Sequence, residues 1–519
     1  MAVQYDPIPL SDFDDIDSER YKSKHWTRRR RCPSALHLFR RVPRLFRPLY
    51  LIIALFAFLN WQVIFNASYS NPPPFAIPRD ENIYIAANII SADLITGAWG
   101  DSLKDLVNLI GKERVHVSIY GGPTAALKSL ESKLDCDNSL VSEEDDPIDL
   151  DALPHITLSS GEQRTKRIAF LAEVRNKALE PLNTLDKKFD KVLFINDVFF
   201  SAADAARILW GSNINAQGVS EYKAACAMDF INSWKYYDTF ATRDFEGYSM
   251  GLPIYPWFSS EGDAVSRGDV LAGRDSIRVK SCWGGMVAFD ARYLQRDISS
   301  TSQAGTTRAE PADLATREIE PVQLPIRFRA EPEPFWDSSE CCLIHADIMA
   351  ATAFQAPSEE VGETYGDGIF VNPYVRVTYD ASTRNYLWLA QRFERLFKVP
   401  QWIINNIAKL PRYNYRRSEA EGDIVDDREW VPHTKSRSRR VLGGEGTGQD
   451  TEIASSRIKR GAERGKEYWD KKGHYVDVKR EAARGGYCGV RSLLVLKESK
   501  GEGEGNWDTM SDEVPPLEN

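Results

Sequence analysis

Short apolar runs alternate with amphipathic segments along the middle of the chain. The runs "NIYIAANII" (82–90), "VHVSIY" (115–120), "KVLFIND" (191–197) and "YKAACAMDF" (222–230) are typical of buried strands. Between and around them, helical spacing of apolar residues is found in "DSLKDLVNLIG" (101–111), "IAFLAEVRNKALEPL" (168–182) and "SAADAARILW" (201–210). Strands that alternate with helices predict an α/β domain, with a mostly parallel sheet covered by helices, over residues 81–410.

The pattern changes at both sides of this domain and twice within it. Residues 387–410 have the spacing of one or two amphipathic helices, with a break expected at Pro400. The segment 135–151 is acidic and loop-like, and 298–323 is rich in Ser, Thr and Pro. Residues 411–519 are predicted to be polar and largely flexible, apart from an apolar fragment at 486–497 that could dock onto the core.

One long run without charge, residues 48–65, follows ten lysines and arginines that lie between residues 22 and 47 without a single acid. Its length is close to the span of a bilayer core. We therefore predict a signal-anchor transmembrane helix at 48–66, behind a basic cytosolic tail at 1–47. A buried core helix is the alternative, but it leaves the one-sided cations unexplained.

This topology makes predictions for the residues that follow the anchor. Residues 67–80 form a Pro-rich stem, and everything beyond it is expected in the lumen. Asn66, in the sequon Asn-Ala-Ser, becomes a candidate glycosylation site next to the membrane. Six of the seven cysteines would face an oxidising compartment, where up to three disulfides can form, although spacing does not assign their pairing. The net charge of −9 gives no basic field that would indicate a nucleic-acid partner.

The end of the run 191–197 carries the first candidate for chemistry. Ligands of open parallel sheets bind outside the carboxyl ends of the strands, and Asn196 and Asp197 are expected there. Asp197 could bind a divalent cation and, through it, a diphosphate. A capping role is the alternative, but Ser201 and Asp204 have the spacing of a capping box that would by itself start the next helix.

Further candidates follow along the chain, each with a structural alternative. Asp229 ends another apolar run, and the aromatic loop after it contains Asp238, Arg243 and Asp244, a composition that suits a sugar but also a solvated loop. Gly284 and Gly285 would allow a close backbone approach to a ligand, or mark a simple turn. The last cluster comprises Asp337, Glu340, His345 and Asp347.

For three residues, the possible functional and structural roles can be named individually. Glu340 could be an acid–base or sugar-binding group, and His345 a metal ligand, a phosphate contact or a buried core histidine. Arg175, within the expected helix, could bind a diphosphate or form an ordinary ion pair.

The order of these segments closely resembles that of fungal glycosyltransferase family 69, the family of cryptococcal α-1,3-mannosyltransferases and capsule-associated proteins. The resemblance covers roughly residues 82–380 and "GGYCGVRSLL" (485–494). It implies a Golgi type II membrane enzyme with a GT-A-like, Rossmann-type nucleotide-sugar fold. It also implies mannose transfer from GDP-mannose to an α-mannoside, with α-1,3 linkage, and a divalent metal, Mn²⁺ or Mg²⁺.

The resemblance also suggests roles for single residues. Asp197 matches the family's metal-binding Asp-x-Asp element, of which this chain has one carboxylate, and His345 is a second candidate ligand. The donor side would include Arg175, Asn176, Asn196, Arg243, Gly284 and Gly285, and the catalytic carboxylates would be Glu340, Asp238 and Asp244.

The chain departs from the family where "GGPTAALKSL" (121–130) replaces a polar loop. The alternatives are therefore transfer from another nucleotide sugar such as UDP-xylose, or a non-catalytic scaffold for polysaccharide synthesis. The expected partners are a nucleotide sugar, a glycan acceptor, the Golgi membrane and other glycosyltransferases, with no nucleic acid.

Overall fold

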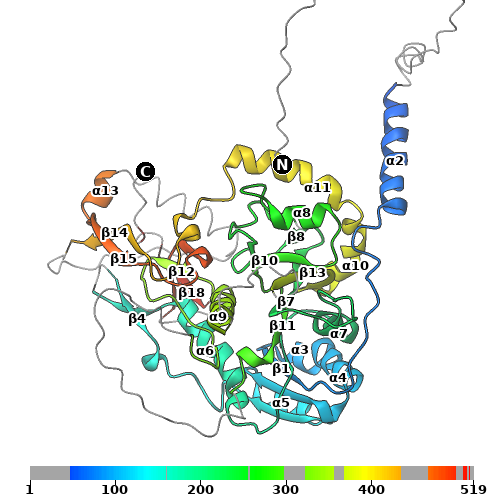
Figure 1. Ribbon diagram of the computed structural model, residues 1–519, viewed down its shortest axis with the longest axis horizontal. Coiled ribbons are helices and arrows are strands. Elements are labelled where there is room, and N and C mark those ends of the chain that lie inside the picture. The colour runs from blue at the N-terminus through cyan, green and yellow to red at the C-terminus, as the bar shows by residue number, and fades with distance from the viewer. Residues whose placement is uncertain are drawn as a thin grey trace, which may run out of the picture. The chain divides into compact units, whose positions relative to one another are not determined.

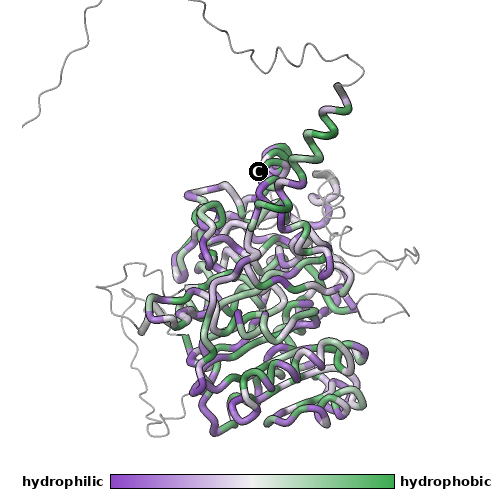
Figure 2. Tube along the Cα trace, turned by 90° about the vertical axis from the view of Figure 1, so that its right-hand side faces the viewer, coloured by the Kyte–Doolittle hydropathy of each residue, from purple (hydrophilic) through white to green (hydrophobic). Residues whose placement is uncertain are grey.

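A computed structural model of the protein (Figure 1) divides into two units, residues 1–61 and 62–519, and each is described by itself. The described residues are 47–158, 161–254, 258–296, 322–355, 368–433, 466–497, 506–510 and 514. Helix α2 (Arg47–Phe65) begins at the end of the basic tail and is apolar along nearly all of its length, as its colour in Figure 2 shows. Its segment Pro48–Phe65 is long and apolar enough to cross a membrane.

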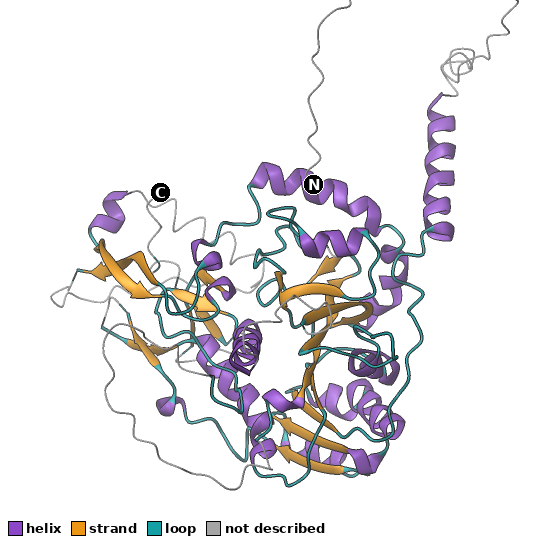
Figure 3. Ribbon diagram, viewed as in Figure 1, coloured by secondary structure: helices purple, strands orange, loops and turns teal. Residues whose placement is uncertain are grey.

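The centre of the second unit is a mixed sheet with the strand order β3-β2-β1-β6-β11-β7-β13-β10-β9, seen as orange arrows in Figure 3. Strands β3, β2, β1 and β6 are parallel, β11 runs against both β6 and β7, and β13 is parallel to β7. The strands are β1 (Ile83–Asn88), β2 (Val115–Tyr120), β3 (Asp137–Val141), β6 (Lys191–Ile195), β7 (Ala224–Asn232), β9 (Arg243–Asp244), β10 (Ile277–Ser281), β11 (Met286–Asp290) and β13 (Ile369–Thr378). The expected α/β class is confirmed.

Both faces of the sheet are buried. Successive residues of a strand point to opposite faces, so each strand contributes side chains to two cores. In β6, Val192 and Phe194 contribute to one core, while Leu193 and Ile195 contribute to the other. One face is covered by α6 (Arg167–Leu179) and α9 (Glu340–Gln355), and the other by α3 (Ala92–Thr96), α4 (Ala98–Ile110), α5 (Thr124–Glu131) and α7 (Ala202–Trp210) (Figure 1). A strand buried on both faces must be apolar throughout, which explains the continuous apolar runs.

Two local predictions about helix ends are confirmed. Ser201 and Asp204 form the expected capping box at the start of α7. Helix α6 ends at Leu179, where Pro181 belongs to a short 3₁₀ turn. Pro400, however, does not break a helix: the break lies between α10 (Ala381–Gln391) and α11 (Glu394–Ala408), and Pro400 is inside α11.

The structure changes two other expectations and leaves a third untested. The first part of the acidic segment 135–151 forms β3, which pairs with β2 along its whole length and belongs to the sheet, whereas residues 142–149 form turns and coil, as expected. The stem at 67–80 packs onto the domain: Tyr69 is buried, and Arg207 Nη1 donates to Pro73 O at 2.8 Å. Most of the segment 298–323 lies outside the described residues.

The chain beyond residue 411 is more ordered than its composition predicted, in the part that the structure describes. β14 (Ile424–Pro432) pairs with β15 (Gly473–Glu481), and β12 (Trp336–Ser338) pairs with β16 (Gly489–Arg491). The fragment at 486–497 is attached to α9 by a disulfide between Cys342 and Cys488. Residues 434–465 lie outside the described part. The remaining elements are β4 (His155–Thr157), β5 (Gln163–Thr165), β8 (Lys235–Tyr236), α8 (Val265–Leu271), α13 (Lys466–Asp470), β17 (Leu494–Leu496) and β18 (Trp507–Thr509).

Candidate functional site

The candidate site lies at one edge of the sheet, where the parallel strands end. Since β11 is antiparallel to both β6 and β7, those two strands point the same way, and β13 follows β7. Asn196 and Asp197 therefore leave the sheet at the same edge as Tyr379, while Gly284 and Gly285 enter it there at the start of β11. Ligands of open α/β sheets bind at such an edge.

The Asn196 backbone is fixed from three sides, and this leaves the next side chain outward. Its N–H donates to Gly285 O at 2.9 Å, and its carbonyl accepts from Trp99 Nε1 at 2.9 Å and from Val198 N at 2.8 Å. The Asp197 carboxylate is exposed and, among the described residues, no other residue lies within hydrogen-bond distance of it. Surrounding protein raises the pKa of Asp197 by partial desolvation, and Arg175 offsets part of this. Because the carboxylate reaches solvent, we take it as ionised at neutral pH.

Arg175 brings a largely buried positive charge to the same edge, and its side chain is 13% exposed. Its Nε donates to Glu340 Oε1 at 3.0 Å, and its Nη1 contacts Asn196 Oδ1 at 3.4 Å. The guanidinium carbon also lies 4.3 Å from the centre of the Trp283 ring, within the range of a cation–π interaction. A buried cation is tolerated here because it has both a counter-ion and aromatic faces. This placement of Arg175 is consistent with the prediction that Arg175 and Asn196 lie near Asp197.

Glu340 is buried at the start of α9, and its Oε1 also accepts from Cys341 Sγ at 3.4 Å. A carboxylate held in this way positions Arg175, and it is a poor candidate for a general base. Asn176 is likewise engaged, since its side chain exchanges two hydrogen bonds with the backbone of Phe328, at 2.9 and 2.8 Å. Asn176 therefore holds the segment that packs against Arg175.

Asp238 and Asp229 form a buried carboxyl pair below the glycine turn. Asp229 accepts from Asp238 N at 3.0 Å and from the Tyr379 hydroxyl at 2.9 Å. Burial, together with the neighbouring charge of Asp238, raises the pKa of Asp229 to about 8, so the pair holds an additional proton at neutral pH. Burial also raises the pKa of Asp238.

The oxygens of Asp238 are occupied by the loop that it closes. They accept from Ala241 N at 3.0 Å, Thr242 Oγ1 at 3.1 Å and Gly284 N at 3.3 Å. This arrangement argues against the predicted catalytic role of Asp238, because its oxygens are already engaged. The pair instead fixes the turn at Gly284, whose positive φ of 60° and 1.9 Å spacing from a would-be Cβ to Ala227 O admit only glycine.

Arg243 and Asp244 do not lie free in the site, contrary to the prediction. Arg243 is buried and donates to five backbone carbonyls, those of Thr239, Phe240, Thr242, Tyr487 and Cys488. It attaches the C-terminal fragment to β9. Asp244 accepts from Glu246 N at 3.0 Å and Tyr248 N at 2.7 Å, which closes a tight turn. Burial raises the pKa of Asp244 to about 7.

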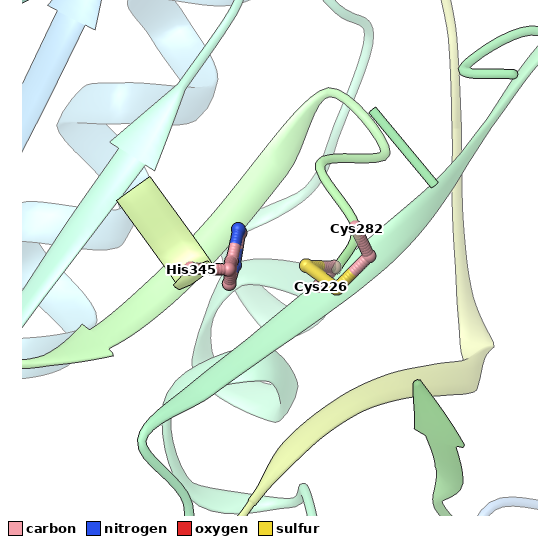
Figure 4. A group of neighbouring side chains, drawn as sticks. All are labelled: Cys226, Cys282 and His345. Carbon is pink, nitrogen blue, oxygen red and sulfur yellow. A yellow bond between two sulfur atoms is a disulfide. The ribbon is translucent and has the colours of Figure 1, made fainter. Parts of the chain in front are cut away.

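His345 is a core residue rather than a ligand of the site. It lies beside Cys226 and Cys282, whose sulfurs are joined as a disulfide with an S–S distance of 2.05 Å (Figure 4). A disulfide offers no thiolate to a metal. The His345 ring packs on Phe289, which pairs with Val192 at the start of β6, about 10 Å from the strand's carboxyl end. Burial lowers the pKa of His345 to about 4, so it is neutral. Asp347 and Asp337 pair with Arg329 and Lys166, respectively.

The Asn66 side chain is also engaged. Its Nδ2 donates to Arg392 O at 2.6 Å, and its Oδ1 accepts from Ser68 N at 3.1 Å. The nitrogen that would carry a glycan is thus held by a backbone carbonyl, and the predicted glycosylation requires this contact to be absent.

Three site residues gave little signal in the sequence. Trp283 stacks on Arg175, Tyr379 binds Asp229, and Cys341 contacts Glu340. Trp283 directly precedes Gly284 and Gly285, and Cys341 directly follows Glu340. Their position next to a candidate residue was the one clue that the sequence offered. Tyr379 follows β13, which became a candidate only when the sheet order placed its end beside β7.

An exposed carboxylate beside a largely buried arginine, at the edge of a mixed sheet where its parallel strands end, defines a candidate site for a phosphate-bearing ligand. Comparison with known proteins places the chain more closely. The family model described as cryptococcal mannosyltransferase 1 matches residues 82–347, which is just over half of the chain. The chain belongs to this family, as the motif order indicated.

Single relatives are more distant. The alpha-1,3-mannosyltransferase CMT1 of Cryptococcus neoformans var. neoformans serotype D is 28% identical over 178 residues, which cover 30% of this chain and 34% of the relative. The match thus spans about a third of that relative's length.

Two solved structures were also found. The mannosyltransferase PcManGT of Pyrobaculum calidifontis, in complex with GDP-Man and Mn²⁺, is 9% identical with a TM-score of 0.27, over 71% of this chain and 88% of that chain. Glucosyl-3-phosphoglycerate synthase of Mycobacterium tuberculosis, with Mn²⁺, UDP and its product, is 11% identical with a TM-score of 0.28, over 70% and 90%. At these TM-scores the two structures carry no argument about the fold or ligands of this protein.

Proposed function

We propose that the protein is a glycosyltransferase with a GT-A-like fold that transfers mannose from GDP-mannose to an α-mannoside through an α-1,3 linkage. Membership in the cryptococcal mannosyltransferase 1 family supports the class of reaction. The observation that carries the assignment to this edge of the sheet is the exposed Asp197 carboxylate next to the buried Arg175.

Asp197 is the residue that would hold a divalent cation, Mn²⁺ or Mg²⁺. Its carboxylate is a hard oxygen ligand without a competing protein partner in the described part of the chain. Such cations accept one or two carboxylates and complete their coordination with water and substrate phosphates, so a single carboxylate fits. When bound, the cation would neutralise the charge that develops on the departing diphosphate.

The protein's own residues would supply the second part of this charge balance. Glu340 and the Trp283 ring hold the Arg175 guanidinium in one position, so its positive charge is preorganised toward the same edge. Transfer from an α-linked donor to an α-linked product retains configuration, and attack from the same face as the leaving group needs no strong base. The absence of a free carboxylate at Asp238 and Glu340 is compatible with this mechanism.

The assay is transfer of labelled mannose by purified full-length protein, with GDP-mannose, an α-mannoside acceptor and Mn²⁺. Asp197→Asn should lower kcat/KM by about 100-fold or more, since metal-assisted charge stabilisation contributes several kcal/mol. Asp186→Asn is the matched control, because Asp186 is an exposed aspartate in the loop before β6. Unchanged activity in Asp197→Asn would exclude the metal role.

A donor panel separates the remaining possibilities. Transfer from UDP-xylose in place of GDP-mannose would revise the donor, and the site would keep its role. If no nucleotide sugar is turned over, and GDP with Mn²⁺ does not raise the melting temperature, the scaffold alternative is favoured.

The proposed location is the Golgi membrane, with α2 as a single type II anchor and the domain in the lumen. The basic residues before α2 and the two disulfides after it support this orientation. Protease protection of the domain in sealed Golgi vesicles tests it. A complex with other glycosyltransferases is the proposed setting, and co-purification tests that separately.

A further inference from the structure

Helix α11 places its polar side chains inward and its apolar side chains outward, the reverse of a helix on a soluble domain. The buried positions are Glu394, Gln401 and Asn405, which are seven and four residues apart and therefore share one face. The opposite face carries Val399, Ile403 and Ile407, and all three are exposed.

The inward face is fixed by specific polar contacts. Gln401 Oε1 accepts from Arg267 Nη1 at 2.8 Å, and Asn405 Oδ1 accepts from Leu252 N at 2.8 Å. Glu394 forms a buried ion pair with Arg376. These contacts determine the rotation of the helix about its axis, so the apolar face cannot turn inward without leaving buried polar groups unpaired.

The exposed apolar face is large and includes aromatic residues. Trp402 and Ile404 flank it on α11, and Tyr386 and Trp388 are exposed on α10. Large apolar side chains that are exposed side by side on one helix indicate an interaction surface. Tryptophan and tyrosine next to aliphatic residues are typical of the membrane–water interface.

The chain that leaves α2 is attached to the beginning of α11, on its inward side. Asn66 follows the last residue of α2 directly, and it exchanges hydrogen bonds with Arg392 at the start of the α10–α11 junction. Two residues later, Ser68 Oγ donates to Glu394 Oε2 at 2.7 Å. If α2 spans a bilayer, residue 66 lies at its surface, and the junction must lie within a few ångströms of it.

The charges around the surface fit a layer of lipid headgroups. Residues 381–414 contain six lysines and arginines and a single acid, Glu394, which is already paired with Arg376. Arg395, Lys409 and Arg412 are exposed beside the apolar residues. Cations that border an apolar helix face are the pattern of helices that lie in a membrane interface.

We propose that the apolar face of α11 lies in the headgroup region of the bilayer that α2 crosses, so that the domain is fixed on the membrane surface. This inference rests on the proposed membrane anchor and is independent of the proposed transfer reaction. The packed stem agrees with it, because a stem that lies along the domain cannot act as a spacer.

The test uses full-length protein in vesicles of phosphatidylcholine and phosphatidylserine that contain a nitroxide-labelled lipid. An environment-sensitive fluorophore is attached to Ile407→Cys, in a background in which Cys32 and Cys136 are serine; Cys341 is buried. Ile407 is 78% exposed, and the matched control is Val219→Cys, 52% exposed in the loop between α7 and β7. The lipid nitroxide should remove about half or more of the emission at 407 and little at 219, since interfacial helices insert about 5–10 Å.

The outcomes separate the occupants of the surface. Flotation of the protein with vesicles, together with quenching at 407 alone, supports the proposal. Flotation without quenching at 407, or with equal quenching at both positions, overturns the proposal. If the label at 407 is shielded from lipid and this position instead cross-links to a second copy of the protein, the surface is assigned to a dimer. Failure to float overturns the anchor and this inference together, whereas the transfer assay is unaffected. If Ile407→Ser leaves the melting temperature unchanged, misfolding is excluded as the cause of any effect of substitution at this position.

Discussion

Replacing Glu340 by glutamine should destabilise the protein far more than the change of one atom suggests. The side chains of Arg175 and Glu340 are only 13% and 5% exposed, and Nε lies 3.0 Å from Oε1. Trp283, Phe194 and Phe328 surround the guanidinium with ring centres at 4.3 to 5.7 Å. Removing one partner of a buried ion pair leaves an uncompensated charge, which costs about 3–5 kcal/mol.

The partner variant and the double variant separate charge from packing. Arg175→Met leaves the Glu340 carboxylate buried without its cation and should cost a similar amount. The double variant removes both charges and retains an apolar side chain against the aromatic rings. Its loss of stability should therefore be smaller than the sum of the two single losses, by about 0.5–3 kcal/mol.

Chemical denaturation of the full-length protein, followed by intrinsic fluorescence, measures these free energies. Arg292→Met is the control, because Arg292 forms an ion pair with Asp290 but its side chain is 70% exposed, and exposed pairs contribute about 0–1 kcal/mol. If Glu340→Gln is no more destabilising than Arg292→Met, the counter-ion role of Glu340 is refuted. The double variant should also be inactive in mannose transfer, because it lacks the Arg175 guanidinium next to Asp197.

Two further predictions concern buried polar groups. The free energy of unfolding should fall as the pH rises from about 4, the pKa of an aspartate in the unfolded state, toward about 8, the raised pKa of Asp229, because the unfolded state releases its proton first. Asp229→Asn should flatten this pH dependence, as measured by urea denaturation at several pH values. An unchanged slope would contradict the prediction. Arg243→Lys should loosen the fragment at 486–497, which the Cys342–Cys488 disulfide still holds, since it leaves several buried carbonyls without donors at about 1–3 kcal/mol each. Limited proteolysis should cut this fragment faster than in the exposed-arginine control Arg428→Lys, and equal rates would argue against the attachment.

The local features of the fold followed from the sequence because they depend on neighbouring residues. Strands buried on both faces require continuous apolar runs, which placed β1, β2, β6 and β7. The capping box of α7 needs residues three positions apart, so Ser201 and Asp204 were recognised. Asp197 followed from the same logic, since the end of a run marks the end of a strand.

The partners of the site residues could not be predicted in this way. Arg243 and Asp238 have the composition of a sugar-binding loop, but their hydrogen-bonding groups are used by backbone that the sheet order brings near, up to 245 residues away for Arg243 and Cys488. Cysteine pairing had the same difficulty, and Cys226–Cys282 and Cys342–Cys488 became clear only from the arrangement of β7, β10 and α9.

Helix α11 marks the boundary between the two kinds of information. Its sequence determined that one face is apolar and the other polar, because a helix repeats every 3.6 residues. Which face points inward depended on Arg267, Arg376 and the backbone of Leu252, which satisfy the polar side from distant parts of the chain. The sequence therefore determined the amphipathic helix, and only the tertiary structure decided that its apolar side faces outward, since polar groups buried by packing must find partners.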